Sequence, residues 1–489
     1  MFALVDASNF YTSCETVFRP SLRGKPVISL SNNDGCAIAR SNEAKALGVK
    51  MGDPWFKIKH LENEAGLIAL SANFALYGDM SDRMMSIAAG LGPMQEIYSI
   101  DESFIGLDGV RGDLVKRSWA IRSRILQWAG LPCGIGIGPT KTLAKLANHI
   151  AKTAERKPGS YPENLAVVCS LAGMPTSDLD ALFAATDVGE VWGVGRRIGK
   201  ELNDAGVHTV LDLVRLSPSM VRNRWSVVLE RTVRELQGEP CINLDDAPAP
   251  KQQIACSRSF GHAVTELGPL IEAISEFTSR AAERLRKQNH FAGQILVFAH
   301  TSAFRPGPRF SKSVVVPLRR PTADSRLLVQ SAVQGIEQIY QFGYQLSKAG
   351  VMLMDLTSDA GIQSELDFNE SEERDKNRLM TVVDSINSRF GRGSIHVGSA
   401  VGVGARREWS MKQERLTPQY TTKWSDACGQ GVKAHRHASR RRFTGSRYQS
   451  EARPRRPSRR TLPQRWSAPA SSGSSLRIGR QQRLPGHRQ

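Results

Sequence analysis

Asp101 and Glu102 stand side by side between two short segments of strand-like composition. Residues 96–100 (EIYSI) and 103–109 (SFIGLDG) are rich in apolar and β-prone side chains. Adjacent carboxylates repel each other and are costly to bury without a cation. The pattern therefore predicts two strands joined tightly around a pair of acids, with positive charge close by.

A third acid, Asp6, ends the apolar run FALV and is expected at another strand end of the same domain. Three carboxylates at one sheet edge form a hard oxygen site that suits Mg²⁺. Two such ions about 3.5–4 Å apart can activate a hydroxyl nucleophile and stabilise a leaving oxygen in phosphoryl transfer. The alternative is that these acids are exposed turn residues.

Tyr11 follows Asp6 closely, within NFYTSCE. A bulky ring beside a metal site can press on a nucleotide sugar and exclude a 2′-hydroxyl group, which distinguishes RNA from DNA. A tyrosine next to a phenylalanine is also common in hydrophobic cores. The residues alone leave both interpretations open.

Residues 134–152 (GIGIGPTKTLAKLANHIAK) place three glycines before a basic helix. Glycines at this position let backbone N–H groups approach a phosphate. The spacing is not that of a P-loop, so the glycines do not define a nucleotide site by themselves. Lys141 and Lys145 share a helix face, which indicates either a DNA contact or a solvated surface.

Residues 191–202 (VWGVGRRIGKEL) have the pattern of a helix-hairpin-helix element. The N–H groups of such a hairpin bind a DNA phosphate without reading sequence. Gly193 and Gly195 would form the hairpin, and Arg196 and Lys200 would add charge. The alternative is an ordinary turn between helices.

The order of elements predicts several domains. Residues 1–165 mix strands and helices as in an α/β domain over a mostly antiparallel sheet, whereas residues 164–238 are expected to be all-helical. Residues 245–251 (DDAPAPK) fit a linker. Beyond them the order β-α-β-β-α-β is the split βαβ pattern. Within the first domain, helices are expected at residues 40–49, 74–89, 113–129 and 140–152.

The net charge of +19 lies mostly in one segment. Residues 427–489 hold 15 Arg and one Lys against a single acid, Glu451, which amounts to +15. This segment is rich in Arg, Ser and Pro and is expected to be disordered. Residues 357–426 are polar and are expected to contain few strong elements. Because residues 427–489 carry most of the net charge, the total charge says little about residues 1–426, whose function must be inferred from local motifs.

Cysteine usage and hydropathy indicate a cytoplasmic protein. The seven cysteines show no CxxC pair and are interpreted as reduced thiols. No apolar run is long enough to cross a membrane, and the start of the chain does not resemble a signal peptide. Residues 363–368 (QSELDF) have the form of a short linear peptide that docks into a pocket of a partner protein.

These motifs together resemble the Y family of translesion DNA polymerases, in particular the UmuC type, the catalytic subunits of DNA polymerase V. The resemblance rests on VDASNFYTSCE, IYSIDESF, GIGPTKTLAKLANH, VWGVGRRIGKEL, YQLSKAGVML and LTPQYTTKW, and covers about residues 1–426. It implies an α/β multidomain, right-hand architecture. The implied domains are a palm (1–165) with small fingers inserted at about 25–70, a helical thumb (166–244), a little finger (252–356), a C-terminal region (357–426) and a disordered basic tail (427–489).

The resemblance also implies site residues and partners. Asp6, Asp101 and Glu102, with the main chain near Ala7, match the ligands of two Mg²⁺ ions. Tyr11 matches the steric gate at the sugar. Lys152 matches the lysine at the incoming dNTP. Asn42 and Lys45 stand where many relatives carry the Tyr and Arg that bind the triphosphate, and Arg40 is expected to share that role. The implied partners are primer–template DNA, a UmuD-type dimer, RecA filaments, and a sliding clamp bound through Gln363, Leu366 and Phe368.

The implied function is error-prone, DNA-templated DNA synthesis past lesions in the SOS response. Two alternatives remain: another two-metal enzyme on a related palm, such as a nucleotide cyclase, and a non-catalytic lesion-binding scaffold. The basic tail departs from the family. Its composition suggests a frameshifted or fused end, and the alternative is a DNA-binding arm.

Overall fold

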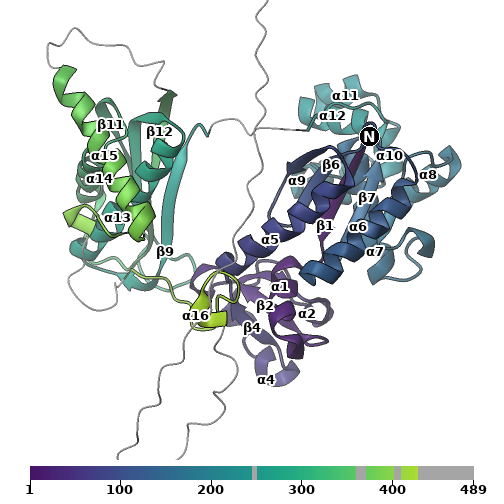
Figure 1. Cartoon of the computed structure of the whole chain (residues 1–489), viewed down its shortest axis with the longest axis horizontal. Helices are drawn as coiled ribbons and strands as arrows, with labels where there is room; N and C mark the ends of the chain where they lie inside the picture. The colour runs from purple at the N-terminus through teal and green to yellow at the C-terminus, as the bar shows by residue number, and fades with distance from the viewer. Residues whose placement is uncertain (245–250, 359–369, 392, 401–408, 428–489) are drawn as a thin grey trace, which may run out of the picture. The chain divides into compact units, whose positions relative to one another are not determined.

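A computed structural model describes residues 1–244, 251–358, 370–391, 393–400 and 409–427 (Figure 1). The strands of these residues form three sheets, with five, four and three strands. The predicted clamp-binding peptide (363–368) lies outside the described residues, as do all but the last residue of the predicted linker (245–251) and all but the first residue of the predicted tail (427–489).

The five-stranded sheet has the order β5-β6-β1-β7-β8 and is antiparallel except for the last pair. This confirms the expectation of a mostly antiparallel sheet in the N-terminal region. Its strands are β1 (Phe2–Ala7), β5 (Met94–Ile97), β6 (Glu102–Gly106), β7 (Cys133–Gly138) and β8 (Val168–Ser170). The associated helices are α1 (Phe10–Phe18), α5 (Phe74–Ala88), α6 (Leu114–Ala129) and α7 (Lys141–Arg156).

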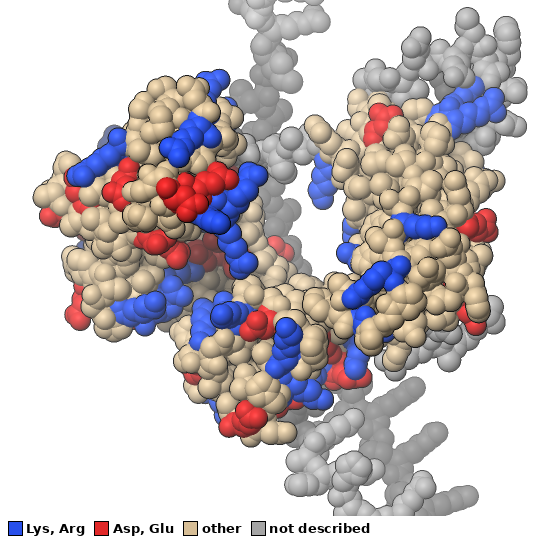
Figure 2. All heavy atoms as spheres, turned by 180° about the vertical axis from the view of Figure 1, so that it is seen from behind, with Lys and Arg blue, Asp and Glu red and all other residues tan. Residues whose placement is uncertain are grey.

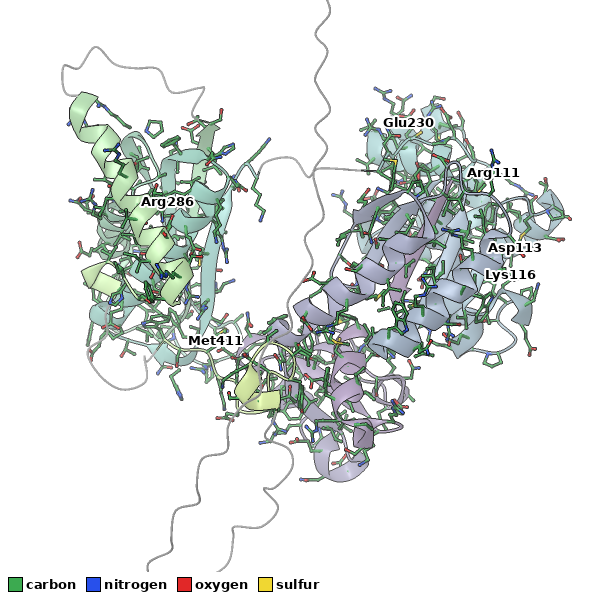
Figure 3. All side chains as sticks on the ribbon, in the orientation of Figure 1. Arg111, Asp113, Lys116, Glu230, Arg286 and Met411 are labelled. Carbon is green, nitrogen blue, oxygen red and sulfur yellow. The ribbon has the colours of Figure 1, made fainter. Side chains whose placement is uncertain are left out.

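Three of the four expected helices, at residues 74–89, 113–129 and 140–152, form within a few residues of their predicted bounds. Asp113 begins α6 because its side chain accepts a hydrogen bond from the backbone N–H of Lys116 at 3.0 Å (both are labelled in Figure 3). Thr140 begins α7 in the same way, accepting from Leu143 N at 3.2 Å. Local capping signals therefore set where these helices start.

The side chains of β1 alternate between the two faces of the sheet. Ala3, Val5 and Ala7 belong to the core shared with α5 and α6, whereas Leu4 packs with Phe104 and Ala144 of α7. Because Asp6 is two residues beyond Leu4, it lies on the α7 face. The strand period thus places this acid toward the basic helix.

The three-stranded sheet has the order β3-β2-β4, built from β2 (Val27–Leu30), β3 (Ala37–Arg40) and β4 (Ile68–Ser71). The expected helix at residues 40–49 is wrong in part. Arg40 ends strand β3, and only α2 (Asn42–Ala46) is helical, capped by the Ser41 side chain. The remaining short helices are α3 (Trp55–Ile58) and α4 (Leu61–Ala65).

Residues 164–238 were expected to be all-helical, and this expectation is wrong at residues 168–170, which form strand β8. Strand β8 pairs in parallel with β7 and therefore extends the five-stranded sheet. The helices begin beyond it, at Thr176. They are α8 (Thr176–Ala184), α9 (Arg196–Asp204), α10 (Val210–Val214), α11 (Pro218–Arg224) and α12 (Val227–Leu236).

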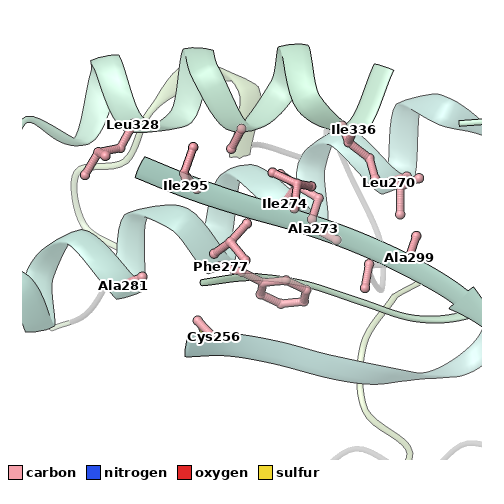
Figure 4. Packing of buried hydrophobic residues seen from close by; sticks show 14 of the residues in the cluster. Cys256, Leu270, Ala273, Ile274, Phe277, Ala281, Ile295, Ala299, Leu328 and Ile336 are labelled. Atoms are coloured by element: carbon pink, nitrogen blue, oxygen red, sulfur yellow. The ribbon is translucent and has the colours of Figure 1, made fainter. Parts of the chain in front are cut away.

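The four-stranded sheet confirms the split βαβ pattern. Its order is β11-β10-β12-β9, so one antiparallel strand lies between the two strands of each βαβ unit. Helices α13 and α14 contribute Phe277, Ile336 and neighbouring apolar residues to one buried core with the sheet (Figure 4). The elements are β9 (Ile254–Val264), α13 (Leu267–Lys287), β10 (His290–Thr301), β11 (Ser311–Thr322), α14 (Ser325–Ile339) and β12 (Leu346–Ser358).

A long helix, α15 (Glu370–Phe390), was not expected from the polar composition of residues 357–426. It is held by tertiary contacts. Arg286 of α13 (labelled in Figure 3) binds both carboxylate oxygens of Asp384 at 2.6 and 2.7 Å. Met380 is buried. A short helix, α16 (Trp424–Ala427), ends the described chain.

The surface of the described residues is mixed in charge. Figure 2 shows Lys and Arg side chains interspersed with Asp and Glu on the visible face. This agrees with the assignment of most of the net charge to residues 427–489. Among the helices of the described residues, none is both long and apolar enough to cross a membrane.

Candidate active site

The three predicted acids meet at one end of strands β1 and β6. Asp6 and Glu102 are direct partners in the antiparallel register of these strands. Asp101 immediately precedes β6, and its carbonyl accepts a hydrogen bond from Ala7 N at 2.9 Å. The structure therefore brings together the acids that the sequence placed at strand ends.

Ser99 shapes the turn that carries the two adjacent acids. Its hydroxyl donates to Asp101 Oδ1 at 2.7 Å and accepts the backbone N–H of Glu102 at 3.0 Å. A single side chain therefore orients one carboxylate and satisfies the backbone of the next residue. This local arrangement explains how the strands join around two like charges.

Lysines of α7 supply the positive charge that the sequence required. Lys152 Nζ lies 2.6 Å from Asp6 Oδ1 and 3.2 Å from the carbonyl oxygen of Ala7, to which it also donates. Lys145 Nζ lies 2.8 Å from Glu102 Oε2. In this structure, two of the three acids are thus neutralised by ammonium groups.

The glycines of β7 explain how α7 comes so close to the sheet. A Cβ atom on Gly136 would lie 2.2 Å from both Ala144 O and Asn148 N. On Gly138 it would lie 2.6 Å from Ala144 N. These glycines therefore serve helix–strand packing, which brings the lysines to the acids, and not the phosphate approach suggested by the sequence.

Lys141 does not lie where the sequence analysis expected it. Its side chain is buried, 2.7 Å from Glu96 Oε2, with its ammonium 4.7 Å from the centre of the Phe104 ring. A buried, paired ammonium is not available to a DNA phosphate, so the expected DNA contact of Lys141 is corrected to a structural ion pair. Lys145 remains partly exposed, with its ammonium over the Tyr98 ring.

The acids line a pocket of about 360 Å³ that also contains the predicted nucleotide-binding residues Tyr11, Arg40 and Lys45. Burial raises the pKa of the Asp6 carboxyl to about 6, Lys152 opposes the rise, and the charges of Glu102 and Asp101 add to it. A buried carboxyl group that two neighbouring acids also act on is typical of a cation-binding site. The full lining is Asp6, Ala7, Asn9, Phe10, Tyr11, Ile38, Ala39, Arg40, Lys45, Met51, Ile100, Asp101, Glu102 and Lys152.

Lys45 and three basic residues whose charges act on it, Arg40, Lys152 and Arg156, are called the cationic cluster below; all but Arg156 line the pocket. Burial, together with the charges of Arg156, Arg40 and Lys152, lowers the pKa of Lys45 to about 8. The Nε atom of Arg40 is buried without a hydrogen-bond partner. Repulsion of this kind is relieved by an anion, which makes the cluster suited to a phosphate chain.

Asn42 is linked to Lys45 of the cationic cluster only indirectly, by way of the Asn9 side chain. Asn9 Nδ2 donates to Asn42 Oδ1 at 2.9 Å, while Asn9 Oδ1 accepts from the ammonium of Lys45. Sequence reasoning missed Asn9 and Arg156. Arg156 follows Lys152 by one helical turn, and this spacing was a usable signal, whereas nothing in the sequence marked Asn9.

Tyr11 is held by other aromatic rings. It stacks on Tyr77 of α5 with ring centres 4.4 Å apart and an angle of 12°, and contacts Phe74 edge-on at 6.0 Å. The ring is half-buried and also lines the pocket. The core-packing and sugar-facing interpretations are thus compatible, since one side of the ring packs while the residue borders the acids.

The hairpin at residues 191–195 precedes α9 as predicted, although the element immediately before it is a short 3₁₀ turn (Val188–Glu190) and not an α-helix. Gly193 has φ of +90°, which favours glycine. Gly195 begins α9 without a side-chain cap and has open space around it. Together with Arg196 and Lys200 it lines an exposed surface pocket.

Comparison with known proteins adds independent information. The impB/mucB/samB family matches residues 5–149, and the C-terminal domain of the same family matches residues 251–366. A domain of unknown function, DUF4113, matches residues 377–427. Together these matches cover most of the described chain.

Protein UmuC of Salmonella typhimurium is 44% identical over 432 residues, covering 87% of this chain and 99% of that protein. Protein ImpB of Salmonella typhimurium is 43% identical, covering 87% and 98%. Among solved structures, a Y-family DNA polymerase chimera of Dbh and Dpo4 aligns with a TM-score of 0.55 at 18% identity, over 73% of this chain and all of that one. This last likeness shows the fold.

The fold and these matches define the class of protein as a Y-family DNA polymerase. The chain belongs to the impB/mucB/samB family, and its relatives place it with the UmuC type. Members of this class are error-prone translesion polymerases.

Proposed function

We propose that the pocket around Asp6, Asp101 and Glu102 is the nucleotidyl-transfer site of an error-prone, DNA-templated polymerase that copies past lesions. The supporting observation is that one pocket combines three carboxylates, Tyr11 and three basic residues of the cationic cluster, Arg40, Lys45 and Lys152. A primer 3′-hydroxyl would attack the α-phosphate of a dNTP and release pyrophosphate. Positioning and charge neutralisation dominate catalysis of such reactions.

The sheets are assigned to the parts of a polymerase hand. The five-stranded sheet would be the palm, the three-stranded sheet the fingers, α8–α12 the thumb and the split βαβ module the little finger. The assignment is supported by the position of the acids on the first sheet and of the hairpin within the helical segment. It keeps the proposed boundaries, except that β8 at residues 168–170 belongs with the palm sheet.

The donor set fits magnesium. Among the described residues, no three acidic, His or Cys side chains are already arranged as metal ligands, and in this state Asp6 and Glu102 pair with ammonium groups. Lys152 donates to both Asp6 and the Ala7 carbonyl, so these two oxygens already bind one positive charge together. Two Mg²⁺ ions held by Asp6, Asp101, Glu102 and this carbonyl would lower the pKa of the primer hydroxyl and offset charge on the leaving pyrophosphate.

The other residues would bind and select the nucleotide. The cationic cluster would bind the triphosphate, and Asn42 would act indirectly by fixing Asn9 against Lys45. Tyr11, whose ring stacks on that of Tyr77, would occupy the space that a 2′-hydroxyl group requires. This arrangement would favour dNTPs over rNTPs by exclusion and not by hydrogen bonding.

The hairpin at residues 191–195 and the start of α9 would bind the primer–template through its phosphates. Gly195 leaves the N–H groups at the start of α9 accessible, and Arg196 and Lys200 are exposed beside them. Such contacts hold DNA of any sequence alike. They suit an enzyme that must act wherever damage occurs.

Three protein partners are also proposed: a UmuD-type dimer, a RecA filament and a sliding clamp. The support is the family membership and, for the clamp, the peptide with Gln363, Leu366 and Phe368. Replacing these three residues with Ala is expected to leave distributive synthesis unchanged and to remove stimulation by the clamp. Stimulation that survives the replacement would place the clamp contact elsewhere.

Primer extension with Mg²⁺ on intact and abasic templates tests the proposed reaction. Asp101→Asn is expected to abolish extension while leaving primer–template affinity within about twofold, because the change removes one charge without altering shape. Glu64→Gln, an exposed acid of α4, is the matched control and should keep full activity.

The same assay separates the alternatives. A wild-type protein that binds lesion-containing primer–template but adds no nucleotide is a scaffold. Conversion of dNTP or NTP without primer would indicate a cyclase-like enzyme. Extension by Asp101→Asn at the wild-type rate would remove this acid from the catalytic site.

A further inference from the structure

Residues 409–420, called the strap below, lie within the segment that matches a domain of unknown function. At its start, Trp409 is 1% exposed and packs edge-on against Phe277 of α13, with ring centres 5.6 Å apart. Ser410 O accepts a hydrogen bond from Gly261 N of β9. A Cβ atom on Gly261 would lie 2.8 Å from that oxygen, so the strap fits closely here. Met411, labelled in Figure 3, comes next.

The middle of the strap adds to the edge of the three-stranded sheet. Leu416 forms a parallel bridge with Ser71 at the end of β4. The Arg415 backbone donates to Ser71 Oγ at 3.0 Å and accepts from Ser71 N at 3.0 Å. Its guanidinium binds both oxygens of Glu62 and lies over the Trp55 ring at 5.0 Å. The strap is thus bound by its backbone and side chains.

The end of the strap reaches the residues that support Tyr11. The Thr417 hydroxyl donates to Glu15 Oε1 of α1 at 3.1 Å, and the Tyr77 hydroxyl donates to the same oxygen at 2.9 Å. Asn73 Nδ2 also contacts Thr417 Oγ1 at 3.1 Å. Thr417 and Glu15 are buried, as is Tyr77, whose ring stacks on Tyr11.

One carboxylate oxygen therefore joins two hydroxyl groups from distant parts of the chain. Burial raises the pKa of Glu15, and the hydrogen bonds from Tyr77 and Thr417 oppose the rise. Hydrogen bonds to a buried carboxyl group are costly to remove because no water replaces them. The Tyr77 hydroxyl is therefore held by Glu15, whose carboxylate Thr417 orients in turn, and it also lies 3.2 Å from the Ser29 hydroxyl.

We propose that Thr417 is a positioning residue that holds Tyr11 in place through Glu15 and Tyr77, and that the strap thereby sets discrimination against ribonucleotides. This inference rests on the proposed role of Tyr11 as the gate at the sugar. Without the Thr417 hydroxyl, Glu15 loses one donor, the Tyr77 ring gains freedom, and Tyr11 no longer presents a rigid face. The strap belongs to the selectivity machinery although it is far from the acids in sequence.

The test compares kcat/KM for dNTP and rNTP incorporation by the full chain. Thr417→Val keeps the side-chain shape and removes the hydroxyl. It is expected to lower the dNTP:rNTP ratio roughly two- to tenfold, the range that one hydrogen bond provides. The KM for rNTP should change more than kcat for dNTP. Thr417→Ser should restore the ratio, and Thr422→Val, an exposed threonine of the same region, should leave it unchanged.

A double-mutant comparison separates positioning from general loosening. In a Tyr11→Ala background, Thr417→Val should have no further effect on the ratio, because the residue through which it acts is gone. An additional loss of the same size in this background would overturn the proposal. If Thr417→Val does not fold, Tyr77→Phe removes the other hydroxyl and should lower the ratio in the same direction.

Failure of this inference can be told from failure of the gate assignment. An unchanged ratio in Tyr11→Ala alone would remove Tyr11 as the gate. A lowered ratio in Tyr11→Ala, with unchanged ratios in both Thr417→Val and Tyr77→Phe, would overturn only the role of the strap.

Discussion

The ammonium of Lys152 lies 2.6 Å from Asp6 Oδ1 and bonds the adjacent main-chain carbonyl as well. The contact links the first strand of the chain to a helix that begins more than a hundred residues later. Both side chains are only 16% exposed, so neither charge is well solvated. The two groups are therefore expected to depend on each other for stability as well as for function.

Lys152→Ala is expected to destabilise the protein by about 1–3 kcal/mol at pH 8, because it leaves the Asp6 carboxylate buried without its hydrogen-bond partner. The pKa of Asp6 is already raised to about 6, and loss of Lys152 raises it further. A raised carboxyl pKa favours the folded state at low pH and costs stability as pH rises through it. The loss should therefore be smaller at pH 5, where Asp6 is protonated.

Denaturant unfolding of wild type and Lys152→Ala at pH 5 and pH 8 measures this difference. Lys116→Ala, which removes an exposed lysine of α6, serves as the control and should change stability little at either pH. An equal loss at both pH values would mean that Lys152 stabilises the fold through packing alone.

Affinity for dNTP should decrease as pH rises through about 8, the pKa of Lys45. A triphosphate favours the charged lysine, so nucleotide binding takes up a proton in this range. The expected effect is an increase of roughly three- to tenfold in the KM for dNTP between pH 7 and pH 9. Arginine stays charged throughout, so Lys45→Arg should show a flatter profile.

Lys50→Arg is the matched control, because this exposed lysine lies outside the pocket. It should keep the wild-type pH profile. A profile for Lys45→Arg that is as steep as that of the wild type would assign the pH dependence to another group.

Gly195→Ala should weaken primer–template binding several-fold on unrelated duplexes alike. The added methyl group meets no protein atom within 4 Å, so the fold should tolerate it, whereas a phosphate approaching the N–H groups of α9 would be obstructed. Gly268→Ala in α13, also in open space, controls for the substitution itself.

The salt dependence of binding distinguishes the two kinds of contact in the hairpin. Gly195→Ala removes no charge and should keep the wild-type slope of log affinity against log salt. Lys200→Ala should reduce that slope by about one phosphate contact. Sequence-selective loss in either variant would contradict a purely phosphate-directed role.

Deletion of residues 427–489 should preserve lesion bypass at physiological salt and reduce non-specific DNA affinity at low salt. The segment carries +15 of the net charge, and counterion release makes such binding steeply salt-dependent. DNA titrations across a salt series, with full-length and truncated protein, measure the change. An unchanged slope would show that the segment does not contact DNA, and loss of bypass would support the DNA-binding-arm interpretation.

Local patterns in the sequence predicted much of the structure. The apolar run FALV formed β1 with Asp6 near its end, and the β-prone segments around Asp101 and Glu102 formed adjacent strands. The split βαβ order followed from element types alone. These features depend on neighbours a few residues apart, which period, capping and turn signals report directly.

Other expectations failed where a distant contact overrode a local signal. Residues 168–170 became a strand because β7 offered an edge, within a region of helical composition. The polar helix α15 gained an anchor in Arg286, which the composition of its own residues could not indicate. Gly136 and Gly138 allow close packing of helix α7 against β7, whereas the sequence had suggested the approach of a phosphate.

In the candidate active site, too, some residues were recognisable from local sequence and others were placed only by distant contacts. Its acids and Tyr11 were recognisable in the sequence, because each lies at a strand or helix end marked by its neighbours. Only the tertiary structure decided the other contacts of the site. These are the ion pair of Lys152 with Asp6, the burial of Lys141, the positions of Asn9 and Arg156 near Lys45, and the link from Thr417 through Glu15 to Tyr77. These contacts join residues brought together by sheet register and helix packing, and their energy depends on burial and distance, which a one-dimensional pattern does not contain.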